Sequence, residues 1–288
     1  MLEITFEGLR ASYRMWGYGN ETIVLLHSGG SSSAQWEKIA EALPAGLSII
    51  APDLIGFGDT DPWPVPGALT HDLQADLTAA VIGAAGYKAV HVVGHSYGGG
   101  TAIRLAVRHP ELVRSLVFIE PIITALLRES NDPLYEKAMQ IGRTFVQSVK
   151  DGAPERGWEE FIDSRNGNGT WARMSDRSKG RFLLQSQQTQ EGFISNWNNK
   201  TTLAECRAIH FPTTIVCSEF AIPEDRRLTE ILRDAISGSR YETIAEAGHM
   251  APLTHPGAVA ENIKRHLARV ARDNPQDHQI RGVAAIEP

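Results

Sequence analysis

One serine set between glycines constrains this chain more than any other feature of its sequence. Residues 89–93 (Ala-Val-His-Val-Val) predict a strand, and residues 101–106 begin an apolar helical pattern. Residues 94–98 between them read Gly-His-Ser-Tyr-Gly, which places Ser96 at a sharp turn from strand to helix. A Gly-x-Ser-x-Gly turn in this context is a nucleophile elbow, in which a strained backbone exposes the serine hydroxyl. The pattern therefore predicts Ser96 as a nucleophile.

The glycines around this serine support the prediction. Glycines occupy all three positions 98–100, although each glycine inside a helix costs roughly 1 kcal/mol against alanine. Close approach of the helix to the sheet explains them, because larger side chains at 94 and 98 would collide with their neighbours. The alternative is an ordinary turn in which Ser96 only caps the helix. A histidine and a carboxylate delivered to the same place would decide between the two.

Length and composition favour a single globular domain. The chain has 288 residues, 42% of them hydrophobic, which suits one sizeable core with room for an insertion. A net charge of −6 without any Lys/Arg run argues against a nucleic-acid or anionic-membrane partner. Cys206 and Cys217 do not suggest a disulfide framework. The first residues lack a signal pattern and no 18-residue apolar run occurs, so we expect a soluble cytoplasmic protein.

Strands and helices alternate over the first 120 residues. Residues 2–7 and 10–16 predict an antiparallel hairpin. Continuous apolar runs are typical of strands buried on both faces of a parallel sheet, and they occur at 22–26, 47–51, 89–93 and 115–119. Helical patterns fall between them, at about 34–43, at 70–86 and after the elbow. This order predicts an α/β fold with a mostly parallel, doubly wound sheet.

The alternation stops between about 123 and 204, where the patterns are helical and three of the six tryptophans fall. We expect this segment to form a helical cap over the sheet edge; the alternative is additional helical packing. Strands at 213–217 and 240–245 and helices at 225–236 and 257–271 then resume the core. The predicted domains are therefore a core of 1–122 and 205–272 and a cap of 123–204. Residues 273–288 lack periodicity, and we expect a mobile tail.

A serine hydroxyl needs a neighbouring base to become a nucleophile at neutral pH. His249 follows the last predicted strand, in residues 245–250 (Ala-Glu-Ala-Gly-His-Met). That position is the carboxyl edge of the sheet, where open α/β folds bind ligands. Gly248 allows the loop to approach the elbow. We predict His249 as the general base.

Four short motifs together resemble the α/β-hydrolase superfamily. They are residues 27–29 (His-Ser-Gly), 53–58 (Asp-Leu-Ile-Gly-Phe-Gly), 94–98 and 248–249 (Gly-His). The resemblance covers roughly residues 20–120 and 210–270, and it is specific to the superfamily but not to a substrate. It implies the α/β-hydrolase fold with an inserted cap and a serine hydrolase that uses neither a cofactor nor a metal.

The sequence offers several candidates for the third catalytic residue, an acid behind the histidine. Most superfamily members carry it in a Gly-x-x-Asp turn after the strand that follows the cap, but residues 218–221 here read Ser-Glu-Phe-Ala. Some relatives, including haloalkane dehalogenases and the fungal zearalenone lactonase, place the acid after the strand that precedes the cap. That position matches Glu120, which we predict as the acid. The alternatives are Glu219, then Glu224 or Asp225, or no carboxylate, with Glu120 held only by loop amides.

An oxyanion hole requires two preorganised N–H donors near the nucleophile. The backbone N–H of Tyr97 follows the nucleophile at the start of the predicted helix. The superfamily resemblance implies the N–H of Gly29 as the second donor, with Ser28 as the nearest alternative. His27 is expected to brace this loop, and Asp53 to have a structural role.

Aromatic and sulfur-containing side chains near the sheet edge and in the cap predict an apolar substrate pocket. With the polar Ser28, the predicted lining residues are Trp36, Phe57, Trp158, Trp171, Phe193, Trp197 and Met250. Each of them is equally compatible with a place in the core.

These features predict a serine hydrolase that cleaves a carboxylic ester or lactone of a hydrophobic small molecule through an acyl-enzyme. The position of Glu120 favours a lactonase-like enzyme. One alternative is hydrolysis of a carbon–carbon bond in a ring-cleavage product, and another is a non-catalytic ligand receptor on a hydrolase scaffold. Ser96 argues against the dehalogenase and epoxide-hydrolase branches, whose nucleophile is an aspartate. The sequence is compatible with a homodimer but does not disclose the oligomeric state.

Overall fold

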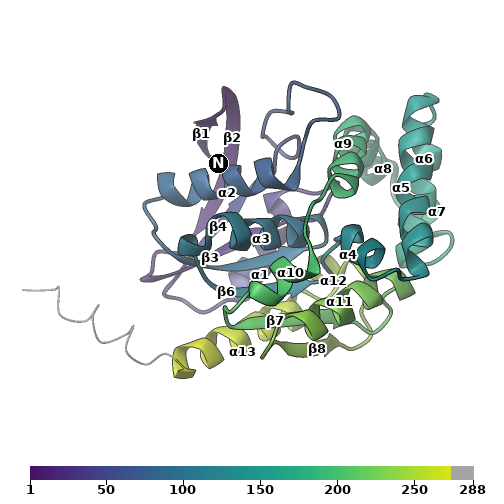
Figure 1. The fold of residues 1–288 in the computed structure, drawn as a ribbon. Helices are drawn as coiled ribbons and strands as arrows, with labels where there is room; N and C mark the ends of the chain where they lie inside the picture. Colours follow the sequence, from purple (N-terminus) through teal and green to yellow (C-terminus); the bar gives the residue numbers. More distant parts are fainter. Residues whose placement is uncertain (274–288) are drawn as a thin grey trace, which may run out of the picture.

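The computed structural model describes residues 1–273, which form a twisted sheet with helices on both faces (Figure 1). Eight strands of this described part pair in the order β1-β2-β4-β3-β5-β6-β7-β8. β2 pairs antiparallel with β1 and β4, and the other neighbours are parallel. The predicted α/β fold with its N-terminal hairpin is confirmed. The strands are β1 (Leu2–Phe6), β2 (Leu9–Trp16), β3 (Glu21–Leu26), β4 (Leu47–Pro52), β5 (Val90–His95), β6 (Val113–Ile119), β7 (Thr213–Ser218) and β8 (Arg240–Ile244).

The central strands are apolar on both sides because each side faces a separate hydrophobic cluster. Along β3, Val24 and Leu26 belong to one cluster, and Ile23 and Leu25 belong to the other. The first cluster contains residues of α2 (His71–Ala84), α3 (Tyr97–Arg108), α10 (Leu203–Ala208) and α11 (Pro223–Ala235). The second contains residues of η1 (Ser33–Trp36), α1 (Glu37–Ala42) and α13 (Pro256–Asp273). This two-sided burial is what continuous apolar strands require.

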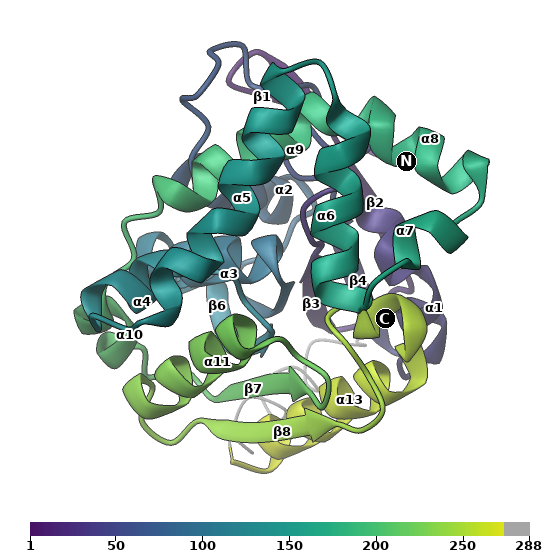
Figure 2. The same cartoon turned by 90° about the vertical axis from the view of Figure 1, so that its right-hand side faces the viewer.

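Residues 123–204 contain helices and no strand, and they lie between β6 and β7 in the chain. In Figure 2, α5 and α6 lie above α11, β7 and β8. The segment has a small hydrophobic cluster of its own, built on Phe145, Trp158, Ile162 and Trp171. α10 crosses the boundary that the sequence predicts between 204 and 205. The helices here are α4 (Thr124–Glu129), α5 (Leu134–Lys150), α6 (Pro154–Asn166), α7 (Thr170–Arg173), α8 (Asp176–Leu184) and α9 (Ser186–Trp197).

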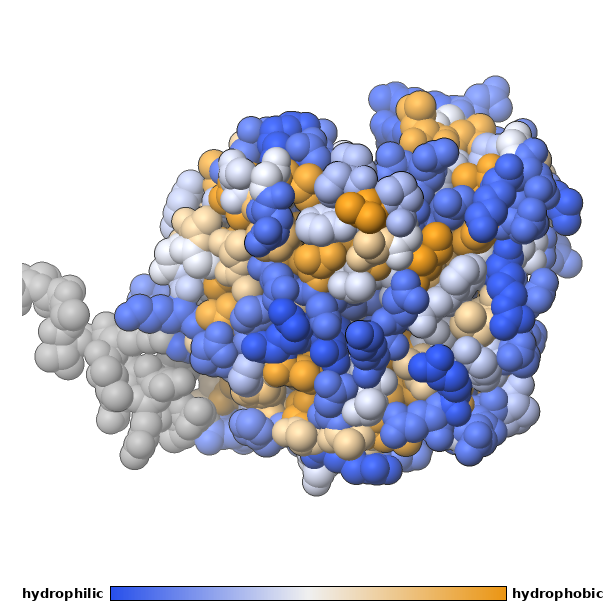
Figure 3. All heavy atoms as spheres, turned by 45° about the horizontal axis from the view of Figure 1, so that its top comes forward, coloured by the Kyte–Doolittle hydropathy of each residue, from blue (hydrophilic) through white to orange (hydrophobic). Residues whose placement is uncertain are grey.

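Two short helices complete the described part, η2 (Pro110–Leu112) and α12 (Ala251–Thr254). Asp273, predicted as the first residue of a mobile tail, is the last residue of α13; the rest of that predicted tail lies outside the described residues. None of the described helices combines the length and apolarity needed to cross a membrane. The face drawn in Figure 3 is mostly hydrophilic, with hydrophobic residues showing in scattered groups.

Candidate active site

Ser96 lies at the bend between β5 and α3 with φ +53° and ψ −116°, a conformation that side-chain-bearing residues rarely adopt. The bend is kept by the Ser96 N–H, which donates to the carbonyl of Ile119 on the adjacent strand at 3.0 Å. A Cβ at position 94 would strike the backbone of Gly98, and a Cβ at 98 would strike the carbonyl oxygen of Leu26. The glycines are therefore sterically required, and the side chain of Ser96 is directed toward the pocket described below.

His249 reaches Ser96 from the loop between β8 and α12. Its Nε2 lies 2.9 Å from Ser96 Oγ, although the two residues are 153 positions apart in the chain. The loop is fixed from below by His95, whose Nε2 donates to the carbonyl oxygen of His249 at 2.8 Å. Burial, together with the neighbouring His249, lowers the pKa of His95 to about 3, so His95 is a neutral brace. Its place beside the nucleophile in the sequence gave no sign of this role.

Glu120 lies behind the imidazole at the end of β6. Its Oε2 is 2.8 Å from His249 Nδ1, and its Oε1 accepts the backbone N–H of Ser218 at 2.7 Å. Burial disfavours the charged carboxylate, but the hydrogen bond and charge of His249 and the hydrogen bonds from Ser218 outweigh it and lower the pKa of Glu120 to about 2. Glu120 is therefore an anion that orients the imidazole. Its φ of +40° is a second strained position beside Ser96.

The other acids weighed from the sequence have different positions. Glu219 is exposed and accepts the N–H of Glu246 at 2.8 Å. Glu224 is paired with Lys137 Nζ at 2.8 Å. Asp225, in the first turn of α11, does reach the histidine: its Oδ2 lies 3.2 Å from His249 Nδ1. Two carboxylates thus face one imidazole nitrogen, and Glu120 is the nearer.

Arg165, near the end of α6, is a residue that the sequence interpretation missed. Its Nε and Nη2 each donate to a different oxygen of Asp225, both at 3.1 Å. It also lines the pocket and lies over the ring of Phe161, 5.1 Å from the centroid. No local pattern signals this role, because it depends on where α6 packs against the core.

The loop after β3 lines the same cavity as Ser96 and Tyr97. Gly29 and Tyr97 line the same pocket, and a Cβ on Gly29 would lie 3.7 Å from Tyr97 Cβ. The backbone N–H of Ser28 donates to Gln35 Oε1 at 3.2 Å, so Ser28 is the weaker candidate for an oxyanion donor. His27 donates from Nδ1 to the Ser28 carbonyl at 2.7 Å and accepts the N–H of Leu54 at Nε2, 3.0 Å away. His27 thus braces the loop.

Asp53 has a similar structural place. Its two oxygens accept the backbone N–H groups of Ser33 at 2.6 Å and Asp59 at 2.9 Å. Asp53 therefore ties two loops together, and its carboxylate bonds these loops and not His249 or Ser96.

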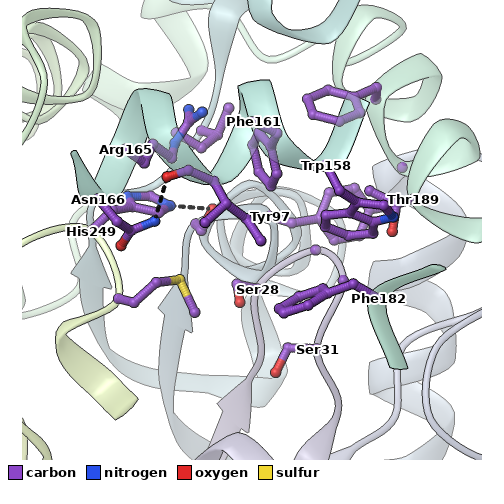
Figure 4. A pocket seen from close by; sticks show the side chains of 18 of the residues that line it. Ser28, Ser31, Tyr97, Trp158, Phe161, Arg165, Asn166, Phe182, Thr189 and His249 are labelled. Carbon is purple, nitrogen blue, oxygen red and sulfur yellow. Dashed lines mark hydrogen bonds between the residues drawn. The ribbon is translucent and has the colours of Figure 1, made fainter. Parts of the chain in front are cut away.

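Ser96 and His249 line a cavity of about 300 Å³, which Figure 4 shows from close by. Side chains from the sheet edge and from α6, α8 and α9 enclose it, and most of its lining surface is apolar. Ser28, Trp158, Phe193 and Met250 of the predicted lining residues contribute to it. The sequence interpretation missed a further group, which is Phe161, Ile162, Asn166, Met174, Phe182, Thr189 and Leu253.

Four predicted lining residues lie elsewhere. Trp36 is fully buried in the cluster under α1 and α13. Phe57 belongs to the core on the other face, edge-on to His27 and Tyr97. Trp171 is packed within the helical segment 123–204, against Phe182. Trp197 lines two other cavities, beside α5 and beside α11. For each, a place near the sheet edge or in the helical segment 123–204 did not fix the direction of the side chain.

Glu120, Asp225 and His249 are also residue types that can bind a metal ion. Ligand atoms of Glu120, Asp225 and His249 lie within 4.8 Å of one another, and all three residues are buried. Asp225 is already neutralised by the Arg165 guanidinium, and His249 Nδ1 is already engaged by Glu120. A cation there would have to displace Arg165, so the donor set fits a hydrogen-bonded triad better than a metal centre.

Comparison with known proteins identifies the family. The model of the alpha/beta hydrolase fold family matches residues 21–256, and the chain belongs to this family of hydrolases. It is 27% identical to the lipase LipV of Mycobacterium tuberculosis over 266 residues, which cover 86% of this chain and 94% of that one. It is 33% identical to the 2-hydroxymuconate semialdehyde hydrolase of Pseudomonas sp. over 120 residues, 41% of this chain and 42% of the relative.

Among solved structures, a thermophilic esterase from Thermogutta terrifontis superposes with a TM-score of 0.77 over 93% of this chain and 98% of the esterase. The sequence identity is 20%, so this likeness concerns the fold. The relatives therefore include a lipase as well as a 2-hydroxymuconate semialdehyde hydrolase.

Proposed function

We propose that this chain is a serine hydrolase of carboxylic esters or lactones with a hydrophobic body. The observation that carries the proposal is the continuous line of hydrogen bonds from Ser96 Oγ through the imidazole of His249 to Glu120 Oε2, at 2.9 and 2.8 Å. A hydroxyl, a base and an orienting anion in this order are what acyl transfer by serine requires.

The reaction follows from these positions. Ser96 Oγ attacks the substrate carbonyl while His249 Nε2 takes the hydroxyl proton, and Glu120 stabilises the imidazolium that forms. The N–H groups of Gly29 and Tyr97 are the proposed donors to the oxygen that becomes negative. His249 then gives the proton to the leaving alkoxide. The resulting alcohol departs when the substrate is an ester, and it stays attached to the acyl group when the substrate is a lactone. A water repeats the sequence on the acyl-enzyme and releases the carboxylic acid.

The walls of the cavity support a hydrophobic substrate body. Trp158, Phe161 and Phe182, which Figure 4 labels, and also Phe193 line it from the helical segment 123–204. Aromatic faces of this kind pack against apolar groups. The lipase and esterase relatives favour an ester, and the place of Glu120 after the strand before the cap is the reason to include lactones among the substrates.

A second candidate is hydrolysis of a carbon–carbon bond next to a ketone. Its support is the similarity to two relatives over part of the chain. The identity is 33% over 120 residues to the 2-hydroxymuconate semialdehyde hydrolase and 35% over 115 residues to a 2-hydroxy-6-oxononadienedioate/2-hydroxy-6-oxononatrienedioate hydrolase of Burkholderia vietnamiensis. The cavity does not separate the two reactions, because both begin at a carbonyl carbon above the serine. A non-catalytic receptor remains the outcome to exclude.

The test is turnover of nitrophenyl esters of graded acyl length and of an aromatic lactone, with Ser96→Ala as the control. We expect hydrolysis by the wild-type chain and a loss of about 10³-fold or more in the variant. Equal rates for the two would show that this serine is not the nucleophile. Turnover of a dienoate ketone in place of the esters would establish the second candidate, and tight binding without turnover would establish the receptor.

A further inference from the structure

The triad needs one carboxylate behind the imidazole, but His249 Nδ1 has two. Glu120 Oε2 lies at 2.8 Å and Asp225 Oδ2 at 3.2 Å, and both side chains are almost completely buried. A single ring N–H faces both acceptors. A second buried anion in this place would be costly unless a cation compensated it.

Arg165 is that cation, and it comes from the cap. The guanidinium grips both oxygens of Asp225 at 3.1 Å, with only 9% of the Arg165 side chain and 2% of the Asp225 side chain exposed. Arg165 is in the last turn of α6, and Asp225 is in the first turn of α11. Each charge therefore also complements the dipole of its own helix end, which stabilises the pair where it stands.

The charges sum differently before and during the reaction. With a neutral imidazole, Glu120 and Asp225 carry two negative charges and Arg165 one positive charge, which leaves the cluster at −1. When His249 takes the serine proton, the cluster becomes neutral. The arrangement therefore stabilises the charged imidazole of the reaction, and the Arg165 guanidinium offsets one of the two negative charges behind it.

We propose that Asp225 is a positioning residue for His249 and that Arg165 offsets the charge of Asp225. The charge around His249 then depends on the contact of Arg165, on α6, with Asp225, on α11. This inference rests on the proposed hydrolase function. Asp225 contacts the base His249, and Arg165 contacts Asp225. Neither residue is proposed to contact the reacting carbonyl.

Among the described residues, Glu120 and Asp225 are the charged groups that contact the imidazole directly. His95, on β5, is neutral because burial depresses its pKa, and its ring centroid lies 5.1 Å from that of His249. Glu224, next to Asp225 on α11, points to Lys137 of α5. Ser96 is on the opposite nitrogen. Glu120, Asp225 and Arg165 are thus the charges that set the balance at His249.

The experiment is the pH profile of kcat/KM on a nitrophenyl ester for Asp225→Asn, Arg165→Met and the double variant. The acid limb of this profile reports protonation of the base in the free enzyme. Loss of the negative charge in D225N moves the limb to lower pH by about one unit, and loss of the positive charge in R165M moves it to higher pH by about one unit. The double variant restores the cluster charge of −1, so its limb returns toward that of the wild type.

The matched control is a second pair between the same helix and the segment before α5. Arg227, also on α11, donates to Asp132 Oδ2 at 2.7 Å. Asp132→Asn and Arg227→Met should leave the acid limb in place. If R165M does not fold, Arg165→Lys keeps the charge and should hold the limb near the wild type, while D225N still lowers it.

The outcomes are separable. A limb that stays fixed in D225N and R165M, or a double variant that deviates more than both single ones, overturns the inference while leaving the hydrolase intact. A wild-type chain with no more turnover than Ser96→Ala overturns the proposed function instead.

Discussion

The carboxylate of Glu120 accepts the backbone N–H of Ser218 from the neighbouring strand at 2.7 Å, and this bond leaves its other oxygen directed at His249. The acid is thus held by two elements of the sheet, β6 through its own backbone and β7 through the Ser218 amide. Because the carboxyl ends of parallel strands meet at one edge, an acid after β6 and an acid after β7 both approach the same imidazole.

Glu120→Gln should therefore lower kcat for ester hydrolysis by about 10²- to 10⁴-fold, because an amide cannot stabilise the imidazolium and favours the wrong ring tautomer. Glu219→Gln should stay within about threefold of the wild type, since Glu219 is exposed and its carboxylate accepts the N–H of Glu246. Steady-state kinetics on one ester decide the matter. A larger loss in E219Q than in E120Q would move the acid to the later loop.

The nucleophile Ser96 is easier to predict from the sequence than the acid Glu120, for a physical reason. The strain at Ser96 is local, so it demands glycines two positions away on each side, and these are visible in the chain. The place of Glu120 depends on which strand end lies nearest His249, which only the assembled sheet decides. Its prediction required the family resemblance.

The helical segment 123–204 also depends on tertiary packing that the sequence pattern does not determine. Helical periodicity predicts that 123–204 is helical, but not which face of α6 meets the core. Arg165 was missed for that reason, and Trp171 was assigned to the pocket although it fills the interior of the cap. Trp36 was misplaced because a short 3-10 helix turns its ring into the core instead of toward the loops.

Gly30→Ala should impair the pocket through one neighbour. Gly30 has φ +70°, and an added Cβ would lie 2.8 Å from Cη2 of Trp158. We expect kcat/KM to fall by about tenfold as the indole is displaced, with a further loss of stability of about 1 kcal/mol from the backbone conformation. Trp158→Phe removes Cη2, so it should recover part of the activity of G30A, whereas alone it loses the hydrogen bond from Nε1 to Ser186. If the double variant is as slow as the product of the two single losses, the clash is not the cause.

His71 should make the fold sensitive to mild acid. It links α2 to α9, with Nε2 2.8 Å from Asn196 Oδ1, and burial lowers its pKa to about 4. The unfolded chain binds this proton near pH 6.5 and the folded chain only near pH 4, so the free energy of unfolding falls as the pH drops through that window. Thermal melting between pH 7 and pH 4 measures the slope. His71→Gln should reduce the slope, and an unchanged slope would assign the acid sensitivity to other groups.

Thr189 of α9 lies on the side of the pocket away from His249 (Figure 4). Its Oγ1 is buried without a hydrogen-bond partner among the described residues, and it lies beside Trp158 in the pocket wall (Figure 4). An unsatisfied buried hydroxyl costs about 1–3 kcal/mol, so Thr189→Val, which keeps the shape, should raise the melting temperature of the free protein. The same variant should lower kcat/KM by about tenfold for substrates whose body carries a hydroxyl or carbonyl, because that group loses its partner. Matched substrates that lack this group should be turned over as before, and an equal loss on both kinds would mean that Thr189 only shapes the wall.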